Sequence, residues 1–487
     1  MASGIGYRYR RHPLSAVPRL LTDPGPSRRT VALGLTAWVA ACARETGTQA
    51  GLPEPPIAFK EASVSIRSGS GVPPPDGWWK IFADPGLDDL VPRANRSNWT
   101  IKLAAARLAQ ARAAAHSSFA LRMPRIGANL NASRQDGPLT NAAGTSGPLL
   151  VAAVNLSYEV DLFGRLARES QATRIDVAER QDLLRAAALL VQADTAETWF
   201  NLRALDAERA VVRGAAEAQA KSAALTRGMV NSGLAPELSL TRLLAESENI
   251  AAEALTLDRR RAELEHALSV LVGEPVSTFQ IPTMDQTATP PVIPPGIPAR
   301  VLARRPDVGA ARQAMLAAMT RVDVARDSWL PNLTLTASGG FASPAVGTLL
   351  RAAAGATGVG ALLSIPLFDG GQYRARVEGA NATLDAAAAT YAQNILEAIK
   401  DVEDQLSGLR LLAEQESVLK NANLAAQRTT ALVASNYRNG LASQLELLDA
   451  QRTELRDRRQ LLRTRAARFQ ASVGLIRALG GGWEATA

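Results

Sequence analysis

The feature that most constrains how this chain can fold is a long internal repeat. Gly233 begins the run Gly-Leu-Ala-Pro-Glu-Leu-Ser-Leu, and Gly440, 207 residues later, begins Gly-Leu-Ala-Ser-Gln-Leu-Glu-Leu. The same offset of 207 residues separates Gly273, which closes Leu-Ser-Val-Leu-Val-Gly, from Gly480, which closes Leu-Ile-Arg-Ala-Leu-Gly. Solenoid repeats are much shorter, at roughly 20 to 50 residues. We therefore expect two copies of one large structural unit to make up most of the 487 residues.

Each copy begins with a pair of predicted strands. The strands are expected at residues 126–134 and 151–161 in the first copy and at 333–341 and 357–367 in the second. The stretches between them are rich in Gly, Ala, Ser and Pro, which is typical of loops. A strand of about ten residues is long enough to cross a membrane when it is tilted.

Two long helices follow each strand pair. They are expected at residues 166–231 and 236–272 in the first copy and at 373–438 and 443–478 in the second. At 1.5 Å per residue, the first helix of each copy is roughly 100 Å long. Leucine-rich positions recur every seven residues, as at Leu243, Ile250 and Leu257. Such heptads indicate helices packed side by side along their length.

Composition and charge favour an elongated helical body over a large globular core. Aromatic residues make up only 5% of the chain, and much of the 47% hydrophobic content is alanine. Of the formal net charge of +8, an excess of +5 lies within residues 1–41. The later arginines alternate with acids on helix faces, so the basic balance does not predict nucleic-acid binding.

The front of the chain has the pattern of a targeting segment. Arg28 and Arg29 precede a short apolar run, residues 31–41, which ends at Cys42, the only cysteine. This run is too short to span a bilayer as a helix. A buried structural cysteine is the alternative, but the run Val-Ala-Ala-Cys resembles a bacterial lipobox, whose cysteine is acylated. The residue after it, Ala43 rather than Asp, is compatible with transfer to the outer membrane.

Closure of the predicted strands sets the oligomeric state. An open sheet edge leaves backbone groups unpaired in lipid, so spanning strands must close into a barrel. Four strands per chain cannot close, because eight is the smallest usual number. Three copies supply twelve strands, and the same symmetry would pack the long helices into a tube below them. The sequence therefore predicts a homotrimer.

Four short motifs then occur in order along the chain. They are Trp78-Trp79-Lys-Ile-Phe82-Ala-Asp84-Pro85-Gly-Leu87, Asp161-Leu-Phe163-Gly164-Arg165, Leu302-Ala-Arg304-Arg305-Pro306-Asp307-Val308 and Ile365-Pro366-Leu-Phe368-Asp369-Gly370-Gly371. With the duplication and the lipobox, they resemble TolC-type outer-membrane efflux proteins, and more narrowly the lipoprotein branch that serves RND-type pumps. The resemblance implies an α+β membrane protein: a TolC-like homotrimer whose twelve-stranded barrel continues into a periplasmic helical tunnel, with a small mixed region at its equator.

The resulting domain division has six parts. Residues 1–41 are the expected signal peptide, 42–77 the lipid anchor and extended tether, 78–281 the first repeat, 282–298 a Pro-rich connector, 299–480 the second repeat and 481–487 a C-terminal tail.

The function implied by the resemblance is a passive exit duct. No nucleophile–base pattern, metal-ligand spacing or phosphate loop occurs, so neither an enzyme nor a cofactor is expected. Energy would come from an inner-membrane RND transporter, reached through a periplasmic adaptor, while outer-membrane lipid surrounds the barrel. An exit duct for type I protein secretion is the alternative. A purely structural coiled coil would leave the strand pairs and the signal unexplained.

The predicted site residues cluster at the turns where the long helices reverse. Gly233 and Gly440 are expected to be turn residues, and with Leu234 and Leu441 they form the tips that would meet the adaptor.

Residues close to these turns form the expected periplasmic gate. The resemblance implies that Tyr437, Glu446 and Asp449 line a closed constriction, where three chains would bring six carboxylates together. The corresponding residues of the first copy are Ser239 and Arg242. Our hypothesis is that Arg242 pairs with one of the acids across neighbouring helices and holds the tunnel shut. The alternative is that the acids are only a solvated helix face.

Overall fold

The computed structural model describes residues 53–61, 75–135, 147–283, 290–294, 296 and 298–481. The chain divides into two compact units, Met1–Gly51 and Leu52–Ala487, and every described residue belongs to the second. The expected signal peptide, Cys42, most of the tether, part of the connector and all but the first residue of the tail lie outside the described residues.

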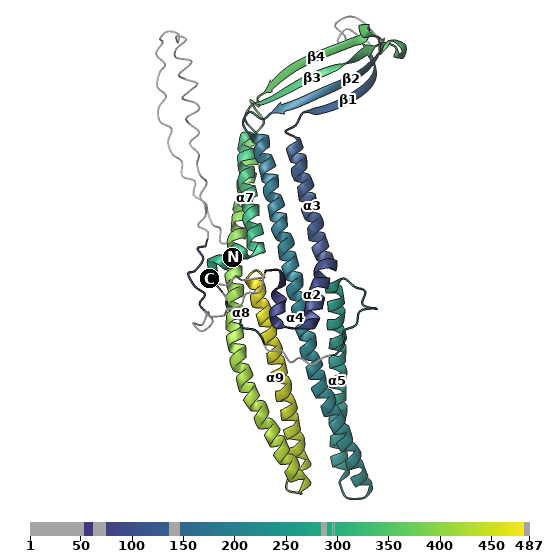
Figure 1. Ribbon diagram of the computed structural model, residues 1–487, viewed down its shortest axis with the longest axis vertical. Helices are drawn as coiled ribbons and strands as arrows, with labels where there is room; N and C mark the ends of the chain where they lie inside the picture. Colours follow the sequence, from purple (N-terminus) through teal and green to yellow (C-terminus); the bar gives the residue numbers. More distant parts are fainter. Residues whose placement is uncertain are drawn as a thin grey trace, which may run out of the picture. The chain divides into compact units, whose positions relative to one another are not determined.

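The described elements follow the predicted order of strands and helices (Figure 1). The first half contains η2 (Pro75–Phe82), α2 (Pro85–Ser97), α3 (Trp99–Ala120), β1 (Arg125–Gln135), β2 (Gly147–Val160), α4 (Arg165–Asn231) and α5 (Glu237–Val272). The second half contains α6 (Pro298–Arg304), α7 (Pro306–Asp327), β3 (Asn332–Ser343), η3 (Val346–Thr348), η4 (Ala352–Ala354), β4 (Gly355–Ser364), α8 (Gln372–Arg438) and α9 (Gln444–Ala478). The α+β class is confirmed. Among these elements, no helix has both the length and the hydropathy of a membrane span.

The two halves match each other element by element. Both α4 and α8 contain 67 residues, and their first residues lie 207 positions apart. The same offset separates the starts of β1 and β3 and those of α3 and α7. In Figure 1, α4 lies beside α5, and α8 lies beside α9. These matches support the duplication that the sequence predicts.

Two strand ends differ from expectation by more than two residues. β4 ends at Ser364, although the sequence predicts a strand to residue 367. Pro366 has no N–H to donate to a ladder, and Asp369 is already needed to start α8. β2 instead begins early, at Gly147, because its pairing with β1 extends to the pair Gln135 and Gly147. Each of the four long helices begins and ends within one residue of its expected bounds.

The strands form one antiparallel sheet in the order β1-β2-β3-β4. The central pair, β2 and β3, joins the two halves of the chain, with Leu150 opposite Ser343 and Val160 opposite Leu333. Within the described residues, the outer edges of β1 and β4 have no strand partner. The sheet of one chain therefore has two open edges, at β1 and at β4.

Cross-strand pairing sorts the sheet into two faces. Residues directly opposite each other share a face, and successive residues along a strand alternate. The polar face contains Asn129, Asn155, Ser157, Thr334, Thr336 and Ser338, with Leu149, Val151 and Leu362 as exceptions. The apolar face contains Ile126, Leu130, Val154, Leu156, Leu335, Val359 and Leu363. Such a sheet suits a boundary between an apolar medium and water.

At the start of each of the two longest helices, α4 and α8, an aspartate carboxylate accepts hydrogen bonds from backbone N–H groups. The first N–H groups of a helix have no partner inside the helix, so a nearby side chain must accept from them. Asp161 accepts from the N–H groups of Leu166 and Ala167, at 3.1 and 2.8 Å. Asp369 does the same for α8, accepting from the Tyr373 N–H at 2.6 Å. Two of the four motifs thus mark the places where strand becomes helix.

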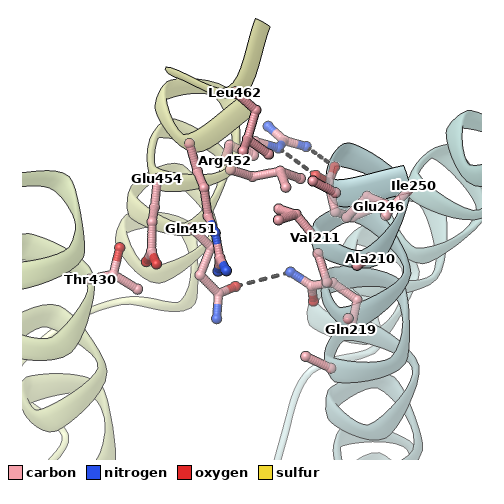
Figure 2. A pocket seen from close by; sticks show the side chains of 16 residues that line it. Ala210, Val211, Gln219, Glu246, Ile250, Thr430, Gln451, Arg452, Glu454 and Leu462 are labelled. Carbon is pink, nitrogen blue, oxygen red and sulfur yellow. Dashed lines mark hydrogen bonds and ion pairs between the residues drawn. The ribbon is translucent and has the colours of Figure 1, made fainter. Parts of the chain in front are cut away.

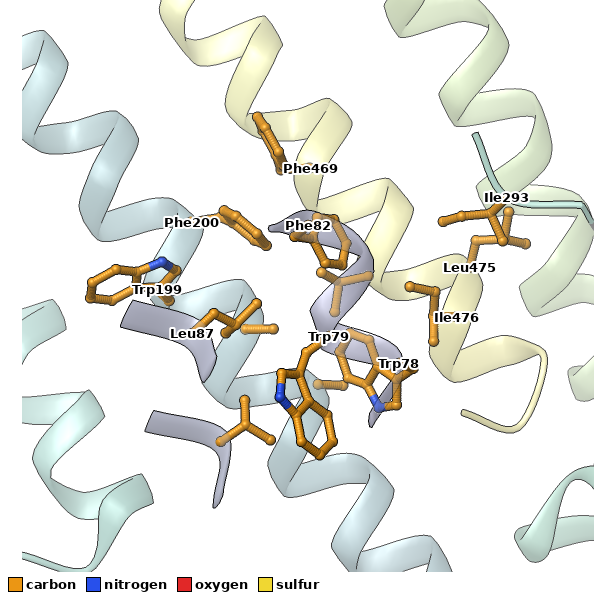
Figure 3. Close-up of a cluster of buried hydrophobic side chains, with 14 of the residues drawn as sticks. Trp78, Trp79, Phe82, Leu87, Trp199, Phe200, Ile293, Phe469, Leu475 and Ile476 are labelled. Carbon is orange, nitrogen blue, oxygen red and sulfur yellow. The ribbon is translucent and has the colours of Figure 1, made fainter. Parts of the chain in front are cut away.

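The main core lies midway along α4 and α8, beside the C-terminal parts of α5 and α9; Figure 3 shows it from close by. We call it the equatorial core; Figure 3 labels its members Trp78, Trp79, Phe82, Leu87, Trp199, Phe200, Ile293, Phe469, Leu475 and Ile476. The Trp78 indole N–H donates to the Gln192 side chain at 2.9 Å. Phe200 of α4 stacks on Phe469 of α9, with ring centroids 4.6 Å apart. The first motif therefore supplies aromatic side chains that pack between the two halves.

Candidate functional site at the helix tips

Both helix reversals are built on glycine. Gly233 and Gly440 have φ angles of 72° and 74°, which favour glycine because it lacks a Cβ. Each turn closes with a six-to-one hydrogen bond, from the Leu234 N–H to Met229 O and from the Leu441 N–H to Asn436 O, both at 2.8 Å. This pair of features defines a Schellman motif. The glycines are thus turn residues, as the sequence predicts.

The residue after each glycine leaves an apolar side chain in solvent. In many Schellman motifs this residue packs back against the last turn of the helix. Here Leu234 and Leu441 are 73% and 77% exposed. Each tip therefore presents a large apolar side chain that the described residues leave mostly exposed.

Glu446, predicted to line the gate, has a partner inside its own chain. It forms a capping box at the start of α9: its carboxylate accepts from the Ser443 N–H at 2.6 Å, and the Ser443 hydroxyl accepts from the Glu446 N–H at 3.2 Å. The carboxylate also accepts from the Ser443 hydroxyl at 3.1 Å. The two hydrogen bonds that the carboxylate accepts, the one from the Ser443 N–H foremost, lower the pKa of the Glu446 carboxyl. The carboxylate is exposed and charged, but part of its hydrogen-bonding capacity is used locally.

The predicted pairing of Arg242 is absent within the chain. Among the described residues, Arg242 forms no ion pair, although Glu446 and Asp449 are exposed nearby on α9. The first turns of α5 and α9 meet instead through the backbone of Ser239, whose carbonyl oxygen accepts from the Gln444 amide at 3.2 Å. The pairing of Arg242 with an acid across neighbouring helices therefore stays a prediction. Tyr437, the aromatic gate residue, is 36% exposed in the last turn of α8.

A row of polar pairs above the tips joins the α4–α5 hairpin to α9. We call this contact the seam. Figure 2 shows two of its pairs: the Gln219 amide donates to Gln451 at 2.9 Å, and Arg452 Nε donates to the Glu246 carboxylate at 2.9 Å. Between them lies a groove of about 520 Å³. Small residues of α4 line one side of it: Ala207, Ala210, Gly214, Ala215 and Ala218.

The most buried ion pair of the seam centres on Glu208 of α4. Its carboxylate accepts from Arg459 Nε at 2.8 Å and from an Arg463 terminal nitrogen at 2.7 Å, both on α9. Glu208 is only 5% exposed. Burial by itself would raise the pKa of Glu208, but hydrogen bonds from Arg463 and Arg459 lower it below its ordinary value. Arg459 also pairs with Glu253 of α5 at 2.5 Å.

Sequence reasoning missed the seam entirely. Glu208 and Arg463 lie 255 positions apart, and neither belongs to a short motif. The 207-residue offset could not reveal them, because the first-copy counterparts of Arg459 and Arg463 are Ala252 and Thr256. Within the described residues, no group of three His, Cys, Asp or Glu side chains could hold a metal ion.

Comparison with known proteins gives a consistent set of relatives. The sequence model of the family described as "Outer membrane efflux protein" matches residues 90–274 and 297–481, two stretches that are offset by 207 residues at both ends. The chain is 32% identical to the pyoverdine export outer membrane protein OpmQ of Pseudomonas aeruginosa, over 84% of this chain and 87% of that protein. It is 27% identical to the cation efflux system protein CusC of Escherichia coli, over 84% and 88%. The solved structure of the outer-membrane channel OprN aligns with a TM-score of 0.81 and 27% identity, over 89% of this chain and 98% of that one.

Proposed function

This chain belongs to the outer membrane efflux protein family, and we propose that it works as the lipid-anchored, trimeric exit duct of a tripartite efflux pump. The exit-duct role in the outer membrane, with a helical body in the periplasm, follows from the family and from the channel structures that share the fold. The family is one of channels rather than enzymes.

The proposal of a trimer rests on the faces and edges of the sheet. Its apolar face suits contact with lipid and its polar face suits a water-filled lumen. The unpaired edges of β1 and β4 would be costly in hydrocarbon, where water cannot satisfy them. Three copies joined edge to edge would form a closed barrel of twelve strands. The long helices would then continue the same threefold arrangement as a periplasmic tube.

The lipid anchor is proposed at Cys42. An acylated N-terminus would fasten the chain to the membrane independently of the barrel. Mass spectrometry of the membrane-extracted protein should find Cys42 as the first residue and carrying acyl chains, whereas Cys42→Ser should carry none. An intact bond between residues 41 and 42 in the extracted protein would refute the anchor.

The cargo is proposed from the chemistry of a wide passive duct. Relatives of similar identity are named for efflux of cations, for pyoverdine export and for antibiotic efflux. Since such different cargo leaves through similar channels, the choice of cargo belongs to the pump. We infer that this duct carries ions or small molecules delivered by an RND transporter through a periplasmic adaptor. The exposed side chains of Leu234 and Leu441 at the tips are where the adaptor would bind.

The gate is proposed at the tips, where Tyr437, Glu446, Asp449, Ser239 and Arg242 would line the constriction of the trimer. Like charges crowded near the axis need opposing cations or hydrogen bonds to stay together. Among the described residues Arg242 forms no ion pair, and we propose that it pairs with an acid of the neighbouring chain.

Planar-bilayer recording tests this gate. Arg242→Glu should raise single-channel conductance, because it replaces the attraction by repulsion. Arg260→Glu is the matched control, since Arg260 lies on the same helix, is also exposed and is far from the tip. Equal conductance for Arg242→Glu and the parent, with intact trimers, would show that these residues are only a solvated face.

A further inference from the structure

The polar face of the sheet carries almost no charge. Within the described strands, the charged residues are Arg125, Arg134 and Glu159. Arg125, opposite Ser157, and Glu159 lie on the polar face. Arg134 is nine positions from Arg125, so alternation along β1 places it on the other face. The charges of the polar face therefore lie at one end of the sheet, where the strands join the helices (Figure 1).

Glu159 has an ion-pair partner, whereas Arg125 has none within the described part of the chain. Arg165, the first residue of α4, binds Glu159 with an N–O distance of 2.7 Å. Arg125 is exposed, and no carboxylate among the described residues pairs with it. Two arginines thus stand beside one carboxylate at this end of the sheet. Each chain therefore leaves one net positive charge on the polar face.

The second repeat has a neutral residue at the corresponding position. β1 and β3 begin 207 residues apart, so Asn332 is the counterpart of Arg125. Asn332 is also exposed, and its side-chain oxygen accepts from the hydroxyl of Thr334, another residue of the polar face, at 3.2 Å. Around the trimer proposed above, three copies of Arg125 would therefore alternate with three copies of Asn332.

The width of such a barrel lets three arginines act on the same ion. Twelve tilted strands that lie about 4.8 Å apart close into a barrel with a radius of roughly 12 Å. The Debye length, over which salt screens a charge, is about 30 Å at 0.01 M but only about 3 Å at 1 M. At low salt an anion on the axis is therefore attracted by all three arginines, and at high salt by none of them.

We propose that the three copies of Arg125 form an anion-binding ring at the periplasmic end of the barrel. The ring favours cargo that carries carboxylate, phosphate or sulfonate groups, because a guanidinium binds such oxygens through paired N–H donors. This proposal rests on the proposed trimeric duct, which it deepens by naming a class of cargo that the barrel favours.

Binding of a trivalent anion tests the ring without depending on the gate. The probe is the trisulfonated pyrene dye pyranine, whose fluorescence polarisation is recorded with detergent-solubilised trimers at about 0.01 M and about 1 M salt. Arg125→Asn makes the position neutral in both repeats, whereas Asn332→Arg places an arginine in both. Arg125→Lys keeps the charge, and Arg260→Asn, which removes an exposed arginine of α5, is the matched control. Heat-modifiable migration checks that each variant is trimeric.

At low salt, Arg125→Asn should bind the dye several-fold more weakly than the parent, and Asn332→Arg should bind it several-fold more tightly. Arg125→Lys and Arg260→Asn should stay close to the parent. All differences should disappear at the higher salt. In planar bilayers with a salt gradient, the reversal potential should shift toward anion preference in Asn332→Arg and toward cation preference in Arg125→Asn.

Equal dye affinity of the parent and Arg125→Asn, or of the parent and Asn332→Arg, would overturn the ring. So would an equal loss of affinity in Arg260→Asn, which would mean that the dye binds arginines of the surface at large. Unchanged reversal potentials would overturn the preference for anionic cargo. If Arg125→Asn does not form trimers, Asn332→Arg still decides, because it leaves Arg125 in place.

The proposed duct stands or falls separately from the ring. Parent trimers that conduct, in which neither dye binding nor reversal potential depends on residue 125, would leave the duct in place and remove only the ring. A parent chain that forms neither trimers nor channels would instead contradict the duct itself.

Discussion

At the residue scale, the motifs that identify the family cap helices or hold neighbouring helices together. Arg305 is 9% exposed and pairs with Asp307 at 2.6 Å and with Asp401 of α8 at 3.0 Å. It also donates to the Ala478 carbonyl at the end of α9, at 3.4 Å. Pro306 and Asp307 begin α7. The motif therefore holds α7, α8 and α9 together.

Replacing the guanidinium of Arg305 should weaken the contact between α7, α8 and α9. Arg305→Lys keeps the charge but loses the two-pronged geometry that reaches both acids. We expect the free energy of unfolding to fall by about 1–3 kcal/mol, the range for lost hydrogen bonds to charged groups. Thermal melting followed by circular dichroism measures this, with the exposed Arg312→Lys as control. Equal melting of the two variants would contradict the assigned role.

Glu208 should make the seam sensitive to acid. Its pKa is lower in the folded chain than the ordinary value of 4.5, so its contribution to stability is complete above that value and is lost as the pH falls through the folded pKa. Melting temperature should therefore stay level from neutral pH to about pH 5 and then fall. In Glu208→Gln the fall should be smaller, because the amide does not titrate. Identical pH profiles of variant and parent would rule out this contribution.

At the element scale, a short segment near the N-terminus is fastened to the middle of α8. Glu403 accepts from the backbone N–H groups of Lys60 and Glu61, at 2.7 and 2.9 Å. Glu61 also pairs with Arg410 at 3.0 Å, and Phe59 is buried in the equatorial core. The sequence predicts only a tether here, whereas the structure shows that its residues 53–61 bind α8.

Removing the acceptor should free this segment. Glu403→Ala leaves two backbone N–H groups without a partner, so cleavage between residues 53 and 61 by an added protease should become faster. Asp404→Ala is the matched control, because Asp404 is exposed and, within the described part of the chain, its carboxylate pairs only with Lys400 on the same helix. Mass spectrometry of the released fragments gives both rates. Equal rates would mean that Glu403 does not hold the segment.

At the scale of the whole molecule, the two faces of the sheet predict opposite outcomes for neighbouring residues in the middle of β2. Val154 lies on the apolar face opposite Gly339, and Asn155 lies on the polar face opposite Ser338. An arginine on a lipid-facing position costs about 2–4 kcal/mol near the membrane midplane. Val154→Arg should therefore reduce the amount of heat-modifiable trimer in outer-membrane fractions. Asn155→Arg should assemble and change only the conductance. The reverse pattern would show that the faces are assigned the wrong way round.

The sequence by itself determined the elements of this protein and the turns between them. The 207-residue repeat, the heptads and the breakers placed the long helices to within one residue, because helix caps and turns such as Gly233 and Gly440 depend on local chemistry. The family motifs could also be recognised in the sequence, and the structure shows that their residues cap helices or hold helices together. The strand ends were less certain, since β2 extends wherever β1 offers a partner.

Only the tertiary structure decided which polar side chains meet. A heptad pattern fits a neighbouring helix almost equally well after a shift of seven residues, so the pattern leaves the axial position of one helix against another open. The partners Glu208 and Arg463, or Lys60 and Glu403, lie hundreds of residues apart and meet only once that position is set. The same holds for Arg242, which the structure shows without an ion pair among the described residues. The bond between Glu446 and its own Ser443 is different, because it belongs to a local Ser-x-x-Glu capping box that the sequence already contains.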